Sequence, residues 1–342
     1  MDGTDTLADM GFVPLRSRTS GGNYKPHFSL SFASGGERRT FGVDTTRNGR
    51  KDDQYFLITH AHTDHYGKSA MLSDRAVASD KTAVTLEMRH NQHFRGRKFR
   101  VGETVDVDGV PVRTYDTKHS IGATAFAWQN DQGVRVLVTG DVKDFRGLPK
   151  CDLLVTEATY GDPYDVDCIF RDDHDAFEAA LGHRRVGFGA YAFGKAQRAV
   201  SMARALGFAD TIAMDRNSLI LTRLLLGDSG GDLVALNGER TPEGVCHRLS
   251  ITSPWTLDNL PFGTKKYVLT GQKRYAHPTI CISDHLDFCG LRDMVEHVDP
   301  AFTLVYHPDA GGNAAAFAAF LRKGGRRSCT LADLSAAAGG PF

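Results

Sequence analysis

The segment His60-Ala61-His62-Thr63-Asp64-His65 brings together side chains that bind metal ions. Imidazole and carboxylate groups are borderline and hard ligands that suit zinc, and manganese or iron also accept them. If the chain is extended here, His60 and His62 project to the same side, and Asp64 and His65 can turn toward a second site. We therefore predict a metal-binding segment. The alternative is a polar loop that is rich in histidine by accident.

Four side chains cannot complete two metal sites, so further ligands must come from elsewhere in the chain. His119 is followed by Ser120-Ile121-Gly122-Ala123, and such small residues let the backbone approach a metal closely. Asp141 follows an apolar run and a glycine, and its carboxylate could bridge two metals about 3.5–4 Å apart. His307 ends the last apolar run. The simpler explanations are a surface histidine, a turn aspartate and a packing histidine.

Three of these places, at His60, Asp141 and His307, follow a short apolar run that is typical of a buried strand, and so do the acid–base residues Glu157 and Asp284-His285. Functional groups at strand ends are held on a rigid frame and can still face a cleft. The runs are 55–59 before His60, 134–139 before Asp141, 153–156 before Glu157, 279–283 before Asp284-His285, and 302–306 before His307. Five such ends predict one site built from several strands.

Residues 166–270 have a different pattern. Helical periodicity over 172–181 and 195–206 alternates with an apolar run at 186–192, and a further short strand and helix follow. This alternation predicts a small α/β layer with parallel strands. We expect it to be an insertion, with residues 1–165 and 271–342 forming the main domain together.

The order of these motifs resembles that of the metallo-β-lactamase superfamily, in its β-CASP nuclease branch. His60-x-His62-x-Asp64-His65, then His119, then Asp141 in Thr-Gly-Asp match the superfamily pattern, and Asp44 in Gly42-Val43-Asp44 resembles its first motif. The branch motifs are matched by Glu157 in Thr-Glu-Ala-Thr-Tyr-Gly, Ser283-Asp284-His285 with Asp287, His307, and Tyr191-Ala192-Phe193-Gly194-Lys195-Ala196-Gln197. The resemblance covers roughly residues 40 to 320. It implies an α/β fold, an αββα sandwich with an inserted small α/β (β-CASP) domain.

The resemblance also implies roles. His60, His62 and His119 would hold one Zn²⁺, Asp64, His65 and His307 a second, and Asp141 would bridge the two, with Mn²⁺ as the alternative metal. Asp44 would orient the site. Glu157 would orient His285, which would protonate a leaving oxygen, so Asp64, Asp141, Glu157 and His285 are the expected catalytic residues. Tyr306-His307-Pro308 departs from the usual Val-His-Gly, which leaves the choice between RNA and DNA open.

Two places in the sequence could contact nucleic acid. Gly194-Lys195 precedes a predicted helix, where phosphate binds well, and Arg198 lies one turn further along. The run from Arg89 to Arg100 interleaves basic residues with Phe94 and Phe99, which suits backbone contact and base stacking. Solvated basic side chains are the alternative at Lys195 and Arg198, and they are the favoured interpretation of the run from Arg89 to Arg100.

The composition of the chain limits the partners and the cellular setting that we expect. The chain has 342 residues with 41 Lys+Arg and 41 Asp+Glu, so its net charge does not indicate a polyanionic partner. Its 6 cysteines form no C-x-x-C pair, which fits a reducing, cytoplasmic setting. The acidic N-terminus lacks a signal-peptide pattern, and the apolar stretch 314–321 is too short to span a bilayer, so we expect no membrane partner.

The favoured function is a zinc-dependent nuclease that hydrolyses single-stranded RNA or DNA, of the exonuclease or 3′-end-processing type. One alternative is a hydrolase of a small ester, thioester or lactone, which would not need Glu157, His285 or the insertion. The other is a catalytically silent β-CASP scaffold, which would have lost metal ligands.

Overall fold

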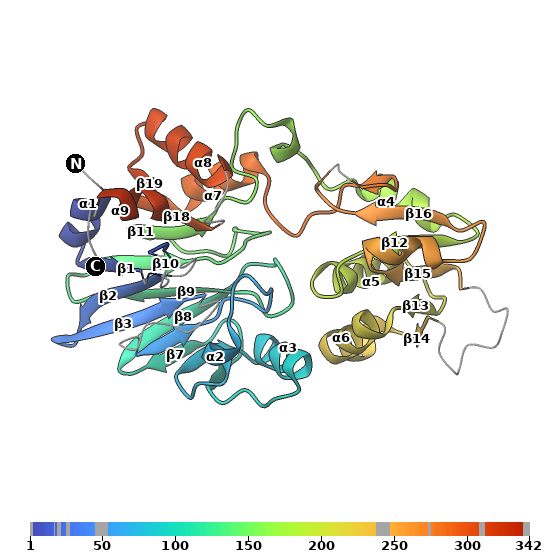
Figure 1. The fold of residues 1–342 in the computed structure, drawn as a ribbon, viewed down its shortest axis with the longest axis horizontal. Helices are drawn as coiled ribbons and strands as arrows, with labels where there is room; N and C mark the ends of the chain where they lie inside the picture. Colours follow the sequence, from blue (N-terminus) through green and yellow to red (C-terminus); the bar gives the residue numbers. More distant parts are fainter. Residues whose placement is uncertain are drawn as a thin grey trace. The chain divides into compact units, whose positions relative to one another are not determined.

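The computed structural model describes residues 3–16, 18, 22–24, 28–44, 54–236, 247–272, 275–307 and 312–337. The chain forms two compact units (Figure 1). The larger unit comprises Met1–Ile169 and His285–Phe342, and the smaller unit comprises Phe170–Asp284. Pro308 lies outside the described residues.

The first sheet of the larger unit has six strands in chain order. They are β1 (Phe12–Leu15), β2 (Phe28–Ser34), β3 (Glu37–Val43), β4 (Tyr55–Leu57), β5 (Ala76–Ser79) and β6 (Arg97–Phe99). β1, β2 and β3 pair antiparallel, and β3 to β6 pair parallel. The carboxyl ends of β3 and β4 therefore meet at one edge of the sheet, which is where Asp44 and the segment from His60 begin.

The second sheet of the larger unit has seven strands. Their order is β19 (Ser328–Thr330), β18 (Phe302–His307), β11 (Leu153–Glu157), β10 (Arg135–Val138), β9 (Thr124–Gln129), β8 (Val110–Asp116) and β7 (Thr104–Val107). β10, β11, β18 and β19 are parallel neighbours. Every residue of β11 is buried, as expected for a central strand covered on both faces. Asp141, Glu157 and His307 all follow or end strands of this parallel group.

The core of the larger unit lies between its two sheets. Phe32 and Phe41 of the first sheet meet Trp128 of the second at ring-centroid distances of 5.6 and 5.4 Å. Helices cover the outer faces (Figure 1). α7 (Phe288–Val298) and α8 (Gly312–Lys323) pack on the second sheet, and α2 (Lys68–Met71) and α3 (Asp80–His90) lie beside the first. α1 (Gly3–Asp9) and α9 (Leu331–Ala337) add apolar residues at the edge of the core. The layers thus follow the order α-β-β-α.

The smaller unit contains a six-stranded parallel sheet. Its order is β14 (Leu233–Ala235), β13 (Ile212–Met214), β15 (Leu249–Thr252), β12 (Val186–Gly189), β16 (Lys265–Leu269) and β17 (Thr279–Ile280). The helices of this unit are α4 (His174–Leu181), α5 (Lys195–Ala205) and α6 (Arg216–Leu226). Apolar faces of α4 and α5 and the sheet form one buried cluster. Short 3-10 helices occur at η1 (Val166–Cys168) in the larger unit, and at η2 (Gly227–Gly230) and η3 (Pro254–Asn259) in the smaller.

The expected parallel α/β layer is present, and its helices begin within two residues of the predicted starts. Two details differ from expectation. The strand expected at 279–283 has two paired residues, Thr279–Ile280, and they pair with β16 of the smaller unit. The smaller unit consequently extends to Asp284, and His285 lies in a loop before α7. Within the described residues, no helix is both long and apolar enough to cross a lipid bilayer.

Candidate metal centre

The predicted histidine segment forms a loop that leaves β4 and packs into the interior of the larger unit. His60 and His65 are fully buried, whereas the side chain of Asp64 is 61% exposed. A hydrogen bond from His65 N to His62 O, 3.0 Å long, folds the loop back on itself. This turn brings His60 and His65 to one side of the loop, with ring centroids 4.1 Å apart.

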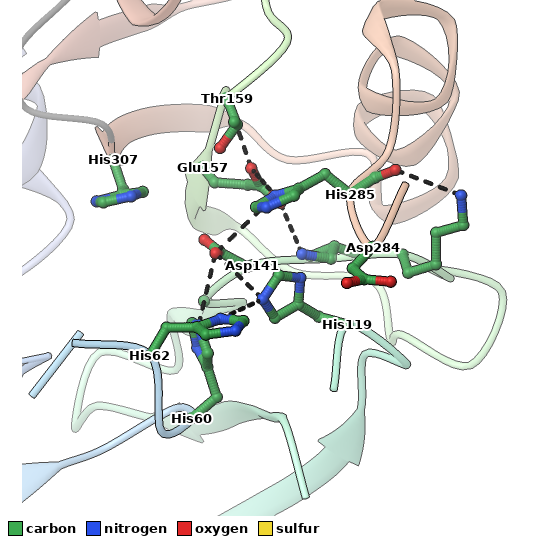
Figure 2. Close-up of polar contacts among 12 residues, drawn as sticks. His60, His62, His119, Asp141, Glu157, Thr159, Asp284, His285 and His307 are labelled. Carbon is green, nitrogen blue, oxygen red and sulfur yellow. Dashed lines mark hydrogen bonds and ion pairs between the residues drawn. The ribbon is translucent and has the colours of Figure 1, made fainter. Parts of the chain in front are cut away.

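The first group of candidate ligands is His60, His62, His119 and Asp141 (Figure 2). Oδ2 of Asp141 lies 3.5 Å from Nε2 of His60 and 3.4 Å from Nε2 of His119. Nδ1 of His62 lies 2.9 Å from Nε2 of His119. Three rings from two separate loops therefore converge on one carboxylate oxygen.

The second group is Asp64, His65 and His307. Oδ2 of Asp64 lies 3.5 Å from Nε2 of His307 and 4.0 Å from Nε2 of His65. The other oxygen of Asp141, Oδ1, lies 3.4 Å from Nε2 of His65. Asp141 thus turns one oxygen toward each group, which is the arrangement that a bridging carboxylate requires.

The donor atoms have the spacing that a metal site needs. Ligands bound at about 2.0–2.2 Å around a tetrahedral zinc lie roughly 3.3–3.6 Å from one another, and the distances around Asp141 fall in that range. Within the described part of the chain, Nε2 of His60, Nε2 of His65 and Oδ1 of Asp141 are buried and make no hydrogen bond. Buried polar atoms of this kind are costly unless something satisfies them. The group fits a bound cation.

Burial and mutual repulsion keep part of this cluster uncharged. Burial, and then the neighbouring His65, holds the pKa of His60 well below its usual value. Burial, and then His119, lowers the pKa of His62 to about 3. Both rings are therefore neutral over the physiological range, which is the form that binds a metal.

The pKa of His65 is shifted in the opposite direction from those of His60 and His62. Burial alone would lower its pKa, but the carboxylates of Asp141 and Asp44 outweigh burial and raise the pKa well above the usual value. For Asp141 the effects have the reverse sign. Burial alone would raise the pKa of this carboxyl, but His65 and His119 hold it well below the ordinary range. His65 thus carries the positive charge that a second cation would replace.

Asp44 contacts the candidate ligand His65 on the side of its ring that faces away from Asp141 and Asp64. Oδ1 accepts from Thr59 N at 2.9 Å, and Oδ2 lies 2.8 Å from His65 Nδ1 and accepts from the Tyr306 hydroxyl at 2.7 Å. Such a partner fixes the ring orientation of a ligating histidine. Asp44 has φ 45°, an uncommon conformation for a residue other than glycine. The sequence indicated Asp44 but not Tyr306, whose only signal was its position before His307.

Glu157 and His285 form a separate pair beside the first group (Figure 2). Nδ1 of His285 lies 3.0 and 3.1 Å from the two carboxylate oxygens of Glu157, and 3.9 Å from Oδ2 of Asp141. Glu157 is fully buried and accepts from the backbone N–H groups of Val142 and Thr159 at 2.7 and 3.2 Å. A fixed carboxylate therefore holds the Nδ1 edge of a partly exposed imidazole. Asp141, Glu157 and His285 also lie close enough together to be a third possible ion-binding group.

Lys195 and Arg198 lie in the smaller unit with two carboxylates. The Lys195 ammonium is 3.3 Å from Asp284 and donates to Ile282 O at 3.0 Å. Arg198 pairs with Asp172 and Asp284 and donates to Ser283 O. The side chain of Lys195 is only 9% exposed. Their expected contact with nucleic acid remains a prediction, and in this structure their charges are balanced by the protein itself.

Asp287 and two residues of the basic run have structural partners. Asp287 caps α7 by accepting from Gly290 N at 2.8 Å. In the basic run, Arg89 donates to Ala61 O at 2.5 Å, and Lys98 pairs with Glu87 at 2.7 Å. Phe94 and Phe99 are buried, so they do not form an exposed stacking surface. The interpretation that these two aromatic residues stack on bases is therefore wrong, and it was not the favoured one for this run.

Comparisons with known proteins give two partial relatives and a fold neighbour. A UPF0173 protein of Pyrococcus furiosus is 32% identical over 102 residues, which is 29% of this chain and 47% of that protein. A UPF0173 protein of Pyrococcus abyssi is 34% identical over 80 residues, 22% of this chain and 37% of that protein. The chain thus spans less than half the length of these curated relatives. No protein-family model matches it.

Among solved structures, a protein of unknown function from Enterococcus faecalis V583 is similar with a TM-score of 0.60. The match covers 86% of this chain and 94% of that one at 11% identity. At that identity the likeness concerns the fold alone. The His/Asp cluster is compatible with a metal-dependent hydrolase.

Proposed function

We propose that this chain is a metal-dependent phosphodiesterase of the metallo-β-lactamase superfamily, in its β-CASP branch, that cleaves single-stranded RNA or DNA. The α-β-β-α layers of the larger unit support the superfamily, and the parallel α/β unit at Phe170–Asp284 supports an inserted domain of the branch. The metal proposed is zinc, two ions per chain, with manganese as the alternative.

The observation that carries this proposal is the Glu157–His285 pair next to Asp141. Cleaving a phosphodiester expels a sugar oxygen, which leaves poorly unless it is protonated. Activated esters and thioesters expel groups that need no proton. An imidazole held by a buried carboxylate at 3.0 Å is suited to donate that proton. The pair therefore argues against a thioester or an activated ester as the substrate. A lactone or alkyl ester also expels an oxygen that needs a proton, and the substrate panel below separates these from a phosphodiester.

One set of residues would bind the cations, and another would transfer the proton. Bound divalent cations supply charge neutralisation at a phosphate and lower the pKa of a water molecule. His60, His62, His119 and Oδ2 of Asp141 would hold one cation. Asp64, His65, His307 and Oδ1 of Asp141 would hold the other.

His285 would act on the leaving group. Both carboxylate oxygens of Glu157 face Nδ1 of the ring, so Nδ1–H donates to Glu157 and proton transfer falls to Nε2. Val142 N and Thr159 N donate to Glu157 and keep it in place. This arrangement orients the ring and fixes its tautomer.

A panel of substrates tests the proposal. Purified protein is incubated with 5′-labelled single-stranded RNA and DNA oligomers, and in parallel with a p-nitrophenyl ester, a thioester and a lactone. We expect cleavage of at least one oligomer and its loss with a chelator. Turnover of the small esters alone would establish the alternative hydrolase. No turnover of any substrate by metal-loaded protein would favour the silent scaffold.

A further inference from the structure

Helix α3 (Asp80–His90) contacts the two loops that carry the first group of candidate ligands, one at each of its ends. Arg89, in its last turn, donates to Ala61 O at 2.5 Å, between His60 and His62. His90 follows, and its Nε2 lies 2.9 Å from the hydroxyl of Tyr66, just beyond His65. The C-terminal end of α3 therefore holds the histidine loop on both of its sides.

The N-terminal end of the same helix holds the loop of His119. The hydroxyls of Ser79 and Thr82 donate to Gly122 O at 2.7 and 3.1 Å. Gly122 has φ 91°, and a Cβ there would lie 2.6 Å from Cβ of Lys81 and 2.8 Å from Oγ of Ser79. Only glycine allows this close approach of the loop to the helix. The requirement for a small residue after His119 thus comes from α3.

We propose that α3 is a brace that sets the spacing between the two ligand loops, and that Arg89 is a positioning residue for the metal centre. The inference rests on the proposal that the cluster binds a cation. His60 and His62 come from one loop and His119 from the other, so their common approach to Asp141 depends on where each loop is held. An 11-residue helix is rigid enough to fix that separation.

This role also separates Arg89 from the rest of the basic run. Its side chain is half-buried against the histidine loop, whereas Arg95, Arg97 and Arg100 are exposed. A guanidinium that donates to a backbone carbonyl holds that carbonyl in one direction. Arg89 acts on the metal through the loop and does not itself contact it.

The test uses Arg89→Met, with Arg89→Lys as the conservative variant and Lys98→Met as the matched control. Lys98 is a cation held by the same helix, but through Glu87 at 2.7 Å. Affinity for Co²⁺ is measured by competition with a chelator, together with the visible spectrum of the bound ion. Supporting partners of ligands typically contribute about 10–100-fold in affinity. We expect a loss of that size in Arg89→Met, a smaller loss in Arg89→Lys and none in Lys98→Met.

A second readout does not depend on metal. Hydrogen exchange of the peptide that contains the His65 amide is measured in all three variants without added ions. Arg89→Met should accelerate this exchange and Lys98→Met should not. Thr82→Val, which removes one hydroxyl at the other end and keeps the Ser79 cap, should accelerate exchange around Gly122 instead.

Unchanged exchange near His65 in folded Arg89→Met would overturn the brace. So would faster exchange with an unaltered Co²⁺ affinity and spectrum. If the unaltered protein bound no Co²⁺ at all, the metal centre would fail, and hydrogen exchange alone would decide whether α3 holds the loops. Circular dichroism establishes that each variant is folded before these comparisons.

Discussion

Each unit contains a cluster of buried ionisable side chains, and the two clusters are satisfied differently. In the smaller unit, Lys195 and Arg198 meet Asp172 and Asp284, so two cations face two carboxylates. In the larger unit, four histidines and one buried aspartate converge, and the atoms of that cluster that make no hydrogen bond include two imidazole nitrogens and one carboxylate oxygen.

This difference in how buried polar atoms are satisfied indicates that the cluster of the smaller unit is structural and that the cluster of the larger unit binds a ligand. Burying a charge is tolerated when a partner offsets the lost hydration, and the smaller unit contains its own partners. The larger unit retains strongly shifted pKa values and unsatisfied donor atoms, which are typical of functional sites. Charge alone did not distinguish the two clusters in the sequence, because the partners of Lys195 and Arg198 are distant along the chain.

The largest effect is expected from the carboxylate shared by the two groups. Asp141→Ala removes the oxygens that face His60, His119 and His65. We expect the unaltered protein to contain two zinc ions per chain by elemental analysis. The variant should lose metal and all phosphodiesterase activity, on natural and activated substrates alike. A variant that keeps two ions would show that Asp141 is not a bridge. Protein purified without chelators that contained no transition metal would remove the basis of the whole comparison.

A smaller and selective effect is expected from His285. General-acid assistance is worth about 10²–10⁴-fold, so His285→Ala should slow cleavage of RNA or DNA by that factor. It should spare most activity on bis-(p-nitrophenyl) phosphate, whose phenolate leaves without a proton. The measurement is kcat on both substrates, with metal content checked in each sample. Equal loss on both substrates with both metals retained would assign His285 another role.

In the smaller unit, the expected effect is on stability. Lys195→Met leaves Asp284 with Arg198 as its remaining cation and removes the hydrogen bond to Ile282 O. Leaving buried polar groups less satisfied costs about 1–3 kcal/mol. Chemical denaturation should show this loss in the free energy of unfolding while metal content stays unchanged. A loss of metal would show that the two clusters are not independent.

The same residue tests the nucleic-acid prediction made from the sequence. If Lys195 contacts phosphate, Lys195→Ala should flatten the salt dependence of oligonucleotide binding by roughly one unit of slope. If its charge is committed to Asp284, the slope should not change. Salt titrations of binding by the unaltered protein and the variant distinguish these outcomes. Exposed Lys265, on β16 of the same unit, provides a control for a cation that lies outside the ion network.

Local pattern predicted strands before the candidate ligands and the helices α4 and α5 of the smaller unit. Apolar runs of the length seen in β10, β11 and β18 have few alternatives to a buried strand. The positions of Asp141, Glu157 and His307 at or just after the ends of these three strands followed directly. Partners across the chain could not be predicted, because pairing of β17 with β16, or of Arg89 with Ala61 O, depends on tertiary packing. The sequence accordingly identified candidate ligands better than the residues that hold them.

The last and smallest effect concerns pH, within the larger unit itself. The pKa of His62 is about 3 and that of His60 is also lowered, so protons compete little for these rings at pH 5.5. The pKa of His65 is raised, so a proton competes with a cation there throughout the neutral range. In the metal-free protein, the stability contributions of these histidines depend on pH in opposite directions. His60 and His62 lose stabilisation as pH falls below about 6.5, whereas His65 contributes below that pH and its contribution is lost as pH rises through its folded pKa.

Metal should therefore leave in two steps. Each proton that a ligand must release changes apparent metal affinity by about tenfold per pH unit below the pKa of that ligand. On dialysis from pH 8 toward pH 5, the group that contains His65 should empty first and the group that contains His60 and His62 should retain its ion. Elemental analysis at each pH gives the ratio of metal to protein. A plateau near one ion per chain supports release in two steps, and its disappearance in His65→Ala, which should bind one ion from the start, assigns the first step to the group of His65. Simultaneous release of both ions would mean that Asp141 couples the two groups more strongly than the separate pKa directions indicate.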